Sequence, residues 1–572
     1  MSRQERGDLP SSSAAGASRP YGRRGYVVFL VVLLALGAMA TTGLLMAKRQ
    51  LPADETVKAG GIPATEPPSK ELKDFAANYF KSWPANQSPE LLLFLTGEQH
   101  NYEAPCGCTL PQFGGIERRY NFITDLRKLG LKVVPLDLGD VYSPGRFADQ
   151  SKLKYQYLMN ALNLMGYEAV AVGQEEFRVP LLDALATTVL DHKYSFTMLG
   201  ANILEKDNYP GENGSMIKDY RVVEPKNCKI KVGVIGTIGQ SVIDEVAKID
   251  RQVKFGNNAK ILPEAINAMK AKKPDVHVLL YQGNEDEAKK LAAVIPDFDV
   301  ILCRCAGSEP PGAVIQIGHT RIVQVGHKGR WIGVVALFRK PDGGLDYRWD
   351  LVSMGIEFKT PKELQSTNSA VKLLEDYTKD VKDKDFLSKF PRGLHPMQSR
   401  FWDATDPLKF RFDPSYIGSD RCKTCHESEF EVWDSSKHPK GWETLIEHER
   451  AKPPHNRQFD TECVICHTTG FGYRTGYITE KQTPHLKGVG CENCHGPGSL
   501  HVSEPKNKEY QLAMTPWKTD HSDSLKVKAV ENKVFTMCFK CHDTDNDHDF
   551  DFAKRWKAIA HGPSVKKDKP KE

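Results

Sequence analysis

Four short motifs near the C-terminus combine residue types that can hold a metal centre covalently. Each places two cysteines three positions apart, with a histidine directly after the second: Cys422, Cys425 and His426; Cys463, Cys466 and His467; Cys491, Cys494 and His495; Cys538, Cys541 and His542. Two thiols on one helical turn can form thioethers to the two vinyl groups of one porphyrin, while the adjacent imidazole reaches the iron. One such match could be accidental, but four within about 120 residues are not. The spacing therefore predicts four covalently attached haems of the c type.

Two other uses of paired cysteines compete with haem. Paired C-x-x-C sequences are common zinc ligands, and a C-x-x-C pair can also form a redox-active disulfide. Neither chemistry needs the histidine that follows the second cysteine in all four motifs. The sequence favours haem attachment over both.

Haem iron takes a second axial ligand when it is six-coordinate, and further histidines are present to supply it. We predict distal ligands at His438, His501 and His561, because each follows a motif at short range and lies near an aromatic residue or a Gly-Pro turn. His485 is a fourth candidate. Six-coordination at most sites favours electron transfer over substrate binding.

The order and spacing of motifs in this segment resemble those of a known family. The first motif, then Trp433, Ser436 and His438, then "CENCHGPGSLH" from Cys491 to His501 resemble the tetrahaem cytochrome c-554-type family, over residues 416–565. The resemblance implies a mostly helical, loop-rich multihaem domain whose closely spaced haems pass electrons along a chain, often with one haem left five-coordinate.

Residues 89–355 follow a different pattern. Short apolar runs rich in β-branched residues alternate with amphipathic helical stretches, which predicts a layered α/β domain. The order of "GGIERRYNFITDLRK", "LDLGD", "MNALNLMGYEAVAVG" and "IVQVGHKGRWIG" resembles the metallophosphoesterase domain of the 5′-nucleotidase family. That resemblance implies a layered sandwich in which Asp, His and Asn at strand ends hold two divalent metals that activate water against a phosphate ester.

Carried over residue by residue, the family's metal site is incomplete here. The family's D-x-H becomes Glu98-Gln-His100, its G-D is kept as Gly139-Asp140, and its G-N-H-E becomes Gly173-Gln-Glu-Glu176, which loses the catalytic imidazole. A later metal-binding histidine falls at about Gln282, and the G-H-x-H motif falls in "CRCAG", with Cys305 near its first ligand position. Phosphatase activity is therefore not expected.

Four thiols fall where this resemblance places the metal-bearing loops. Cys106 and Cys108 follow the first strand, Cys303 and Cys305 follow a late strand, and all four would converge with Glu98, His100 and Asp140. Three uses remain open: a redox-active thiol site that exchanges electrons with the haems, a soft-metal site with thiolate ligands, or ordinary disulfides.

The N-terminus carries a candidate membrane anchor. Residues 25–47 are charge-free and mostly apolar and follow Arg19, Arg23 and Arg24, which predicts a single transmembrane helix with residues 1–24 in the cytoplasm. The alternative is a signal peptide cleaved near Ala38–Ala40. Both interpretations place the rest of the chain outside the cytoplasm, in the periplasm or its equivalent.

The remaining segments are expected to be linkers or tails. We expect a solvated linker over residues 48–88, a helical linker over 356–415 that bridges or packs between the two globular parts, and a disordered tail over 566–572. The predicted architecture is thus multi-domain: anchor, α/β domain, helical linker, tetrahaem domain over 416–565.

Charge balance and motifs together limit the classes of function that the chain could have. The chain has 78 Lys and Arg residues against 73 Asp and Glu residues, which gives no case for a nucleic-acid partner. We expect an electron-transfer cytochrome whose partners are redox proteins or quinone-linked donors. A catalytic multihaem oxidoreductase with one five-coordinate haem and a nucleotidase fused to a cytochrome are the alternatives, so whether the chain is an enzyme stays open.

Overall fold

The computed structural model describes residues 69–105, 111–179, 185, 194–204, 206–211, 214–397, 414–447, 456–515, 522–543, 546–547 and 549–561. Among the residues described, no helix combines the length and apolar composition that a membrane crossing requires. The predicted anchor at 25–47, the segment 1–24 before it, Cys106, Cys108 and the tail 566–572 lie outside the described residues.

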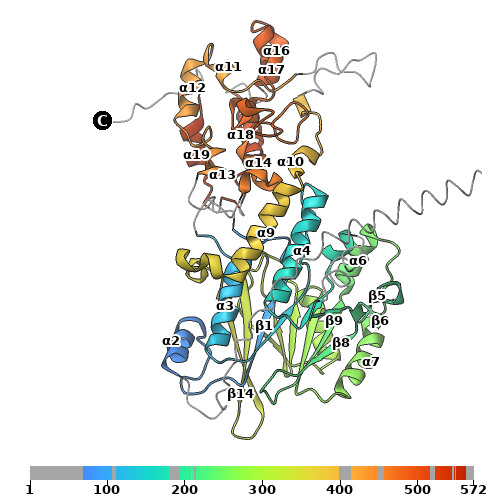
Figure 1. The fold of residues 1–572 in the computed structure, drawn as a ribbon. Helices are drawn as coiled ribbons and strands as arrows, with labels where there is room; N and C mark the ends of the chain where they lie inside the picture. Colours follow the sequence, from blue (N-terminus) through green and yellow to red (C-terminus); the bar gives the residue numbers. More distant parts are fainter. Residues whose placement is uncertain are drawn as a thin grey trace, which may run out of the picture. The chain divides into compact units, whose positions relative to one another are not determined.

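Two sheets form the centre of the α/β domain (Figure 1). The seven-stranded sheet has the order β15-β14-β1-β2-β3-β4-β7, with β1 Leu91–Thr96, β2 Val133–Asp137, β3 Ala169–Ala171, β4 Thr197–Leu199, β7 Ile217–Lys218, β14 Trp331–Arg339 and β15 Leu345–Ser353. The six-stranded sheet has the order β12-β13-β11-β10-β9-β8, with β8 Tyr220–Val223, β9 Val232–Ile238, β10 Val276–Gln282, β11 Val300–Cys303, β12 Ile315–Ile317 and β13 Thr320–Val323. A short pair, β5 Pro210–Gly211 and β6 Gly214–Ser215, stands apart from both.

Alternating side chains of the central strands explain why the domain is layered. In β1, Leu91, Leu93 and Leu95 enter the core between the two sheets, whereas Leu92 and Phe94 enter the core under the helices. A strand with both faces covered reads as a continuous apolar run, as "LLLFL" does. The predicted layered α/β domain is confirmed.

Helices cover the outer face of each sheet. The helical layers are α3 Ile116–Lys128 and α4 Ala148–Leu164 beside the seven-stranded sheet, with α7 Asn258–Lys270 and α8 Glu285–Val294 beside the six-stranded sheet. A further helix, α6 Gln240–Ile249, contributes Val242 and Val246 to the core between α3, α4 and the seven-stranded sheet. The domain therefore has four layers, helix, sheet, sheet and helix.

Two helices fall in segments that the sequence assigned to linkers. Helix α2, Lys70–Tyr79, lies in the expected spacer 48–88, yet Leu72 and Phe80 are buried in the core of the α/β domain. Helix α9, Ser369–Asp383, lies in the expected helical linker and buries Leu373 and Leu374 in the same core. Helix α9 agrees with the expected helical linker. The apolar face of α2 explains its difference from the expected solvated spacer, which would leave Leu72 exposed.

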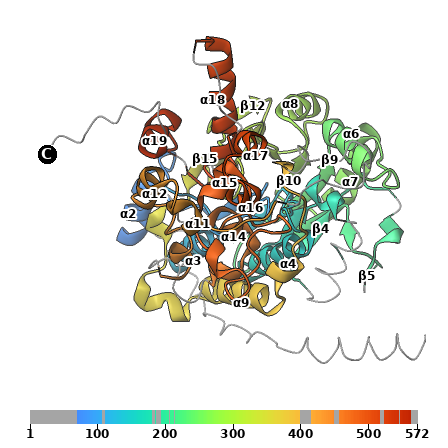
Figure 2. The same cartoon turned by 90° about the horizontal axis from the view of Figure 1, so that it is seen from above.

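The region after residue 414 is built from short helices and loops (Figure 2). They are α11 Asp420–Lys423, α12 Glu427–Asp434, α13 Glu443–Ile446, α14 Thr461–His467, α15 Cys491–His495, α16 Ser499–Ser503, α17 Lys508–Met514, α18 Ser524–Cys538 and α19 Phe552–Ile559. The described residues of this region contain no strand. The predicted mostly helical, loop-rich C-terminal region is confirmed.

The core of this region is small. Its largest cluster of buried apolar residues, to which the preceding α10 Phe386–Lys389 contributes, consists of Leu387, Phe390, Tyr416, Trp442, Leu445, Val464, Phe471, Tyr477 and Leu486. So few apolar side chains cannot by themselves stabilise a region of this length.

A polar network joins helix α4 to the turn that precedes α14. Gln150 Nε2 donates to Asp460 Oδ1 at 2.7 Å, and Thr461 Oγ1 donates to Gln150 Oε1 at 2.6 Å. Lys154, whose side chain is 3% exposed, pairs with Glu103 at 2.9 Å and with Glu462 at 2.6 Å. The loop that follows β1 is thereby linked, through one lysine, to the helix of the second cysteine motif.

Candidate functional site

The four cysteine motifs all lie on single helical turns. Two lie at helix C-termini, since α14 ends at His467 and α18 ends at Cys538, and α15 spans the whole third motif. The amide of His426 donates to the carbonyl of Cys422 at 3.0 Å, and that of His542 to Cys538 at 2.9 Å. This turn places both thiols and the imidazole of a motif close to one another, as haem attachment requires.

Three motif histidines have a second imidazole opposite them. The ring centroids lie 6.1 Å apart for His426 and His501, 6.2 Å for His438 and His542, and 5.9 Å for His495 and His561. A ring nitrogen binds a metal at about 2 Å and lies about 1 Å from its ring centre, so two axial imidazoles on one ion are about 6 Å apart. The separations fit one metal ion between each pair.

In three of the four motif histidines, the hydrogen-bond partner of Nδ1 determines which ring nitrogen can bind a metal. The Nδ1 atoms contact Gly441 O at 2.6 Å for His467, Met514 O at 2.9 Å for His495 and Asp547 Oδ2 at 2.7 Å for His542. A carbonyl or carboxylate oxygen accepts a hydrogen bond from Nδ1–H, which leaves the lone pair on Nε2 for a metal.

His467 and His485 differ from these pairs. No other imidazole among the described residues lies against the His467 ring, although residues 448–455, which include two histidines, lie outside them. His485 is exposed on the short 3-10 helix η8, Pro484–Leu486, and makes none of the ring contacts found among the described histidines. The structure thus brings together His438, His501 and His561 with motif histidines but not His485.

Cysteine contacts give the spatial order of the motifs. The hydrogen bond between Cys422 and Cys491 raises the pKa of Cys422, and the bond between Cys466 and Cys541 lowers that of Cys541. Burial and the neighbouring Cys538 raise the pKa of Cys494 to about 12. The first motif is therefore next to the third, the third next to the fourth, and the fourth next to the second.

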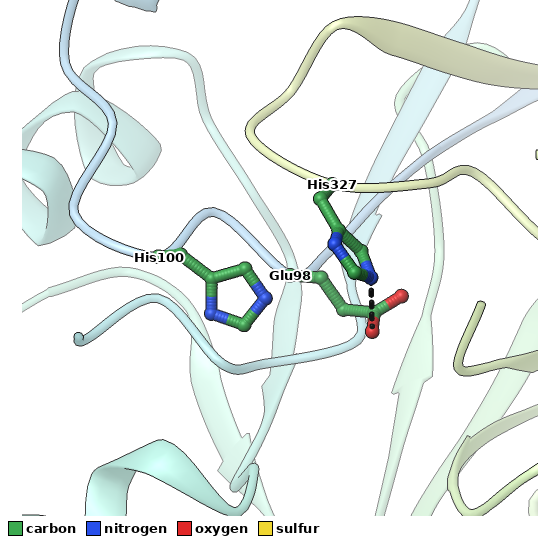
Figure 3. A group of neighbouring side chains, drawn as sticks. All are labelled: Glu98, His100 and His327. Carbon is green, nitrogen blue, oxygen red and sulfur yellow. Dashed lines mark ion pairs between the residues drawn. The ribbon is translucent and has the colours of Figure 1, made fainter. Parts of the chain in front are cut away.

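A second cluster lies in the α/β domain, where the loops after five strands meet. Glu98 follows β1, Asp140 follows β2, Gln174 follows β3, Arg304 follows β11 and His327 follows β13. Within each sheet these strands run parallel to one another, so their carboxyl ends share an edge. Figure 3 shows His327 in an ion pair with the carboxylate of Glu98, with His100 nearby.

Backbone groups hold the two carboxylates of this cluster. Cys305 N–H donates to Glu98 Oε2 at 3.0 Å, and Glu175 N–H donates to Asp140 Oδ1 at 2.8 Å. Glu176, at the position where the sequence retains the family's acidic residue, accepts from Gly173 N at 2.8 Å and from the amides of 140–142. Glu176 therefore shapes the loop around Asp140.

Arg304 is a fixed cation within the cluster. Its Nε lies 3.4 Å from Asp140 Oδ2 and 3.7 Å from Glu98 Oε1, and its Nη1 donates to Gln174 Oε1 at 2.9 Å. Burial and nearby cations lower the pKa of His100 to about 4, so this imidazole is neutral near pH 7. The contact with Glu98 raises the pKa of His327.

The thiols of Cys303 and Cys305 do not both point toward Glu98, His100 and Asp140 as the sequence predicted. Cys303 is buried within the core under α7 and α8, and burial raises the pKa of its thiol to about 12. Cys305 is a free thiol that donates to the carbonyl of Glu309, and it reaches the cluster through its backbone. Neither thiol is activated, and the predicted convergence fails for Cys303 because strand alternation turns its side chain into the core.

Arg304 and His327 were missed by sequence reasoning. Arg304 lies between the two cysteines of "CRC", and His327 lies in "QVGHKG" directly after a β-branched run. A charged or imidazole side chain just beyond the carboxyl end of a buried strand was the available signal.

Comparisons with known proteins match both parts of the chain. The family described as "Cytochrome c554 and c-prime" matches residues 421–496. Cytochrome c-554 of Nitrosomonas europaea is 32% identical over 138 residues, which are 23% of this chain and 58% of that protein. The C-terminal region is cytochrome c-554-like. This confirms the resemblance drawn from the motifs, and the cytochrome c family implies haem c.

The other matches fall on the α/β part. The snake venom 5′-nucleotidase of Gloydius brevicauda is 24% identical over 296 residues, which are 50% of this chain and 48% of that protein. Among solved structures, a 5′-nucleotidase precursor from Thermus thermophilus is 22% identical with a TM-score of 0.41, covering 51% of this chain and 59% of that one. The chain thus spans about half the length of the curated relatives it matches.

Proposed function

We propose that this chain is a tetrahaem c-type cytochrome that transfers electrons outside the cytoplasmic membrane, to which residues 25–47 anchor it. The observation that carries the proposal is the set of three imidazole pairs, each 5.9 to 6.2 Å between ring centroids, with one member of each pair next to a cysteine motif. Haem c, when bound, supplies an iron that takes up and releases single electrons.

The protein residues have distinct tasks in this proposal. The cysteine pairs would hold each haem covalently, the motif histidines would each supply one imidazole ligand, and His438, His501 and His561 would supply a second imidazole at three sites. Each distal histidine faces the histidine of a motif other than the one that it follows in sequence. Segments that are distant in the chain therefore contribute to the same site. Bis-imidazole ligation leaves no open position for substrate, which favours electron transfer.

The order of the sites supports a relay. Contacts between cysteines link the first motif to the third, the third to the fourth and the fourth to the second. A linear chain has two ends, at the first and second motifs. We propose that redox proteins or quinone-linked donors exchange electrons at these ends.

The experiment is a haem count combined with axial-ligand spectroscopy on the exported protein. We expect an intact mass that exceeds the polypeptide by four haems and electron paramagnetic resonance signals of bis-imidazole, low-spin iron at three sites. His501→Ala and His561→Ala should each convert one haem to a high-spin form. A mass without added haem would contradict the proposal.

A matched control is available for these variants. His485→Ala removes an exposed histidine that has no imidazole opposite it among the described residues, so the spectrum should not change. Equal spectral changes in His485→Ala and His501→Ala would contradict the assignment of ligands.

A second function rests on His467. Its ring has no imidazole partner among the described residues, which suits a five-coordinate haem that binds a small nitrogen or sulfur compound. Addition of carbon monoxide to the reduced protein distinguishes the two functions. A spectral shift at one haem favours the oxidoreductase, and no shift leaves electron transfer alone.

We do not propose a nucleotidase. The catalytic imidazole expected from the family resemblance is replaced within Gly173–Glu176, and the acidic residue there binds backbone amides. Phosphate release from a nucleotide in the presence of a divalent metal would overturn this conclusion.

A further inference from the structure

Three side chains of the α/β domain are arranged as a set of metal ligands. Glu98, His100 and His327 each offer one ligand atom, and these atoms all lie within 4.8 Å of one another. The rings of His100 and His327 lie 5.2 Å apart at 81°, and Figure 3 shows the ion pair between His327 and the carboxylate of Glu98, with His100 nearby. Two loops, after β1 and after β13, supply them.

Buried oxygens in the cluster lack hydrogen-bond donors. Glu98 and Asp140 are both 0% exposed, and among the described residues neither Glu98 Oε1 nor Asp140 Oδ2 accepts a well-formed hydrogen bond. His327 Nε2 lies 3.3 Å from Glu98 Oε1, at ion-pair distance (Figure 3). An unpaired buried carboxylate oxygen is costly, because it has lost its contacts with water. A bound cation is one ligand that would satisfy such an oxygen.

Arg304 lies near both unpaired carboxylate oxygens but does not form a close hydrogen bond with either. Its Nε lies 3.4 Å from Asp140 Oδ2 and 3.7 Å from Glu98 Oε1, longer than a charge-assisted hydrogen bond. Its guanidinium also binds Gln174, so it contacts two positions, Asp140 and Gln174, that lie in metal-site motifs of the resembling family. The space for one of two metal ions is thereby taken by a side chain of the protein.

The backbone around the cluster is held in unfavourable conformations. The φ angles of Glu98, His100, Asp140 and Lys328 are 50°, 50°, 55° and 64°. Such a conformation is unfavourable for a non-glycine residue, and such residues gather at functional sites. Four of them in adjoining loops indicate that the loops are built to present these side chains.

We propose that Glu98, His100 and His327 bind one divalent transition-metal ion, and that Arg304 replaces the second ion of a dinuclear site. Two imidazoles and one carboxylate suit zinc, iron or manganese, and they leave positions on the ion for water or a ligand. The residues of this chain fit one ion but not two. This inference is independent of the haem sites and goes beyond electron transfer.

The test uses the full haem-loaded chain after treatment with a chelator. Isothermal titration with Zn²⁺ should give one saturable site per chain, and Zn²⁺ should raise the Tm of the α/β domain followed by circular dichroism. His327→Gln, whose parent side chain is 26% exposed, should lower the affinity about tenfold or more without preventing folding. His319→Gln, at an exposed position, is the matched control and should bind as the parent does.

Arg304→Gln tests the second half of the proposal. It removes the guanidinium from Asp140 and Gln174, so a second equivalent of Zn²⁺ should bind. Absence of saturable binding, two sites in the parent, or unchanged affinity in His327→Gln would overturn the single-ion site. A single site in Arg304→Gln would overturn the role given to Arg304.

Discussion

At the scale of single residues, the partner of the outer ring nitrogen tunes each axial histidine. His542 Nδ1 lies 2.7 Å from Asp547 Oδ2, and Asp547 is 7% exposed, whereas His467 and His495 donate to neutral carbonyls. A carboxylate acceptor makes the imidazole a stronger donor to iron than a carbonyl does, which stabilises the oxidised state. The fourth haem should therefore have a lower reduction potential than this pairing of ligands would otherwise give.

Asp547→Asn tests this effect. The amide removes the charge but keeps the shape, so the potential of one haem should rise by tens of millivolts, where about 60 mV corresponds to a tenfold change in a one-electron equilibrium. Potentiometric titration followed in the visible spectrum measures it. Asp549→Asn, two residues away and exposed, removes the same charge without the contact and should shift the potential far less. Equal shifts would mean that only net charge matters.

Residues with a fixed local pattern could be predicted, and residues placed by the fold could not. The cysteines and proximal histidines follow from three adjacent positions, and His438, His501 and His561 follow from their nearness to a motif. The motif that each distal histidine faces does not follow, because His438 lies closest in sequence to Cys425 yet faces His542. Arg304 and His327 come together only because two loops meet at one sheet edge.

At the scale of elements, helix α4 does more than cover a sheet. Lys154 on α4 is buried between Glu103 in the loop after β1 and Glu462 on α14. The two carboxylates raise the pKa of Lys154, which keeps the ammonium charged despite its burial. One side chain therefore connects the loop that also carries Glu98 and His100 to the helix that carries Cys463 and Cys466.

Lys154→Met should lower the free energy of unfolding by about 2–3 kcal/mol. Loss of one partner from a buried ion pair costs about 3–5 kcal/mol, and the partial exposure of Glu462 reduces that figure. Denaturant titrations followed both by far-ultraviolet circular dichroism and by the Soret band measure the change.

Lys290→Met is the control for this experiment, because Lys290 is exposed on α8. Its stability should stay within about 0.5 kcal/mol of the parent. A Lys154→Met protein as stable as the control would show that the network contributes little.

Elements in the connecting segments were harder to predict than those in the domains. The period of α9 predicted a helix, yet its docking on α4 depends on buried Tyr377, whose hydroxyl also accepts from Gln150. Helix α2 was hidden by the charged composition of its surroundings, although Leu72 and Phe80 pack into the main core. Composition averages over a segment and therefore misses one apolar face.

At the scale of the whole molecule, apolar burial is unevenly distributed. The α/β domain holds three cores, one under each helical layer and one between the sheets. The C-terminal region has one main cluster and a second made of Met397, Tyr510 and Ala513. Four porphyrins would supply the apolar surface that this region lacks.

A chain produced without haem attachment should accordingly fold in one part only. Limited proteolysis should degrade the region after residue 414 quickly and leave a resistant fragment that begins near α2 and includes α9. Mass spectrometry of the fragments identifies the boundaries. Equal resistance of the C-terminal region in haem-free and haem-loaded protein would contradict this expectation.

The crossing of distal histidines between motifs bears on how the protein is assembled. If the chain is exported from its N-terminus, Cys422 and Cys425 emerge first, but His501 emerges only about eighty residues later. The third site is completed last, because its second imidazole, His561, is the last of the paired histidines in the sequence. Truncation just before His561 should therefore leave all four porphyrins attached while one iron lacks its second imidazole, so that covalent maturation and completion of ligation are separate events.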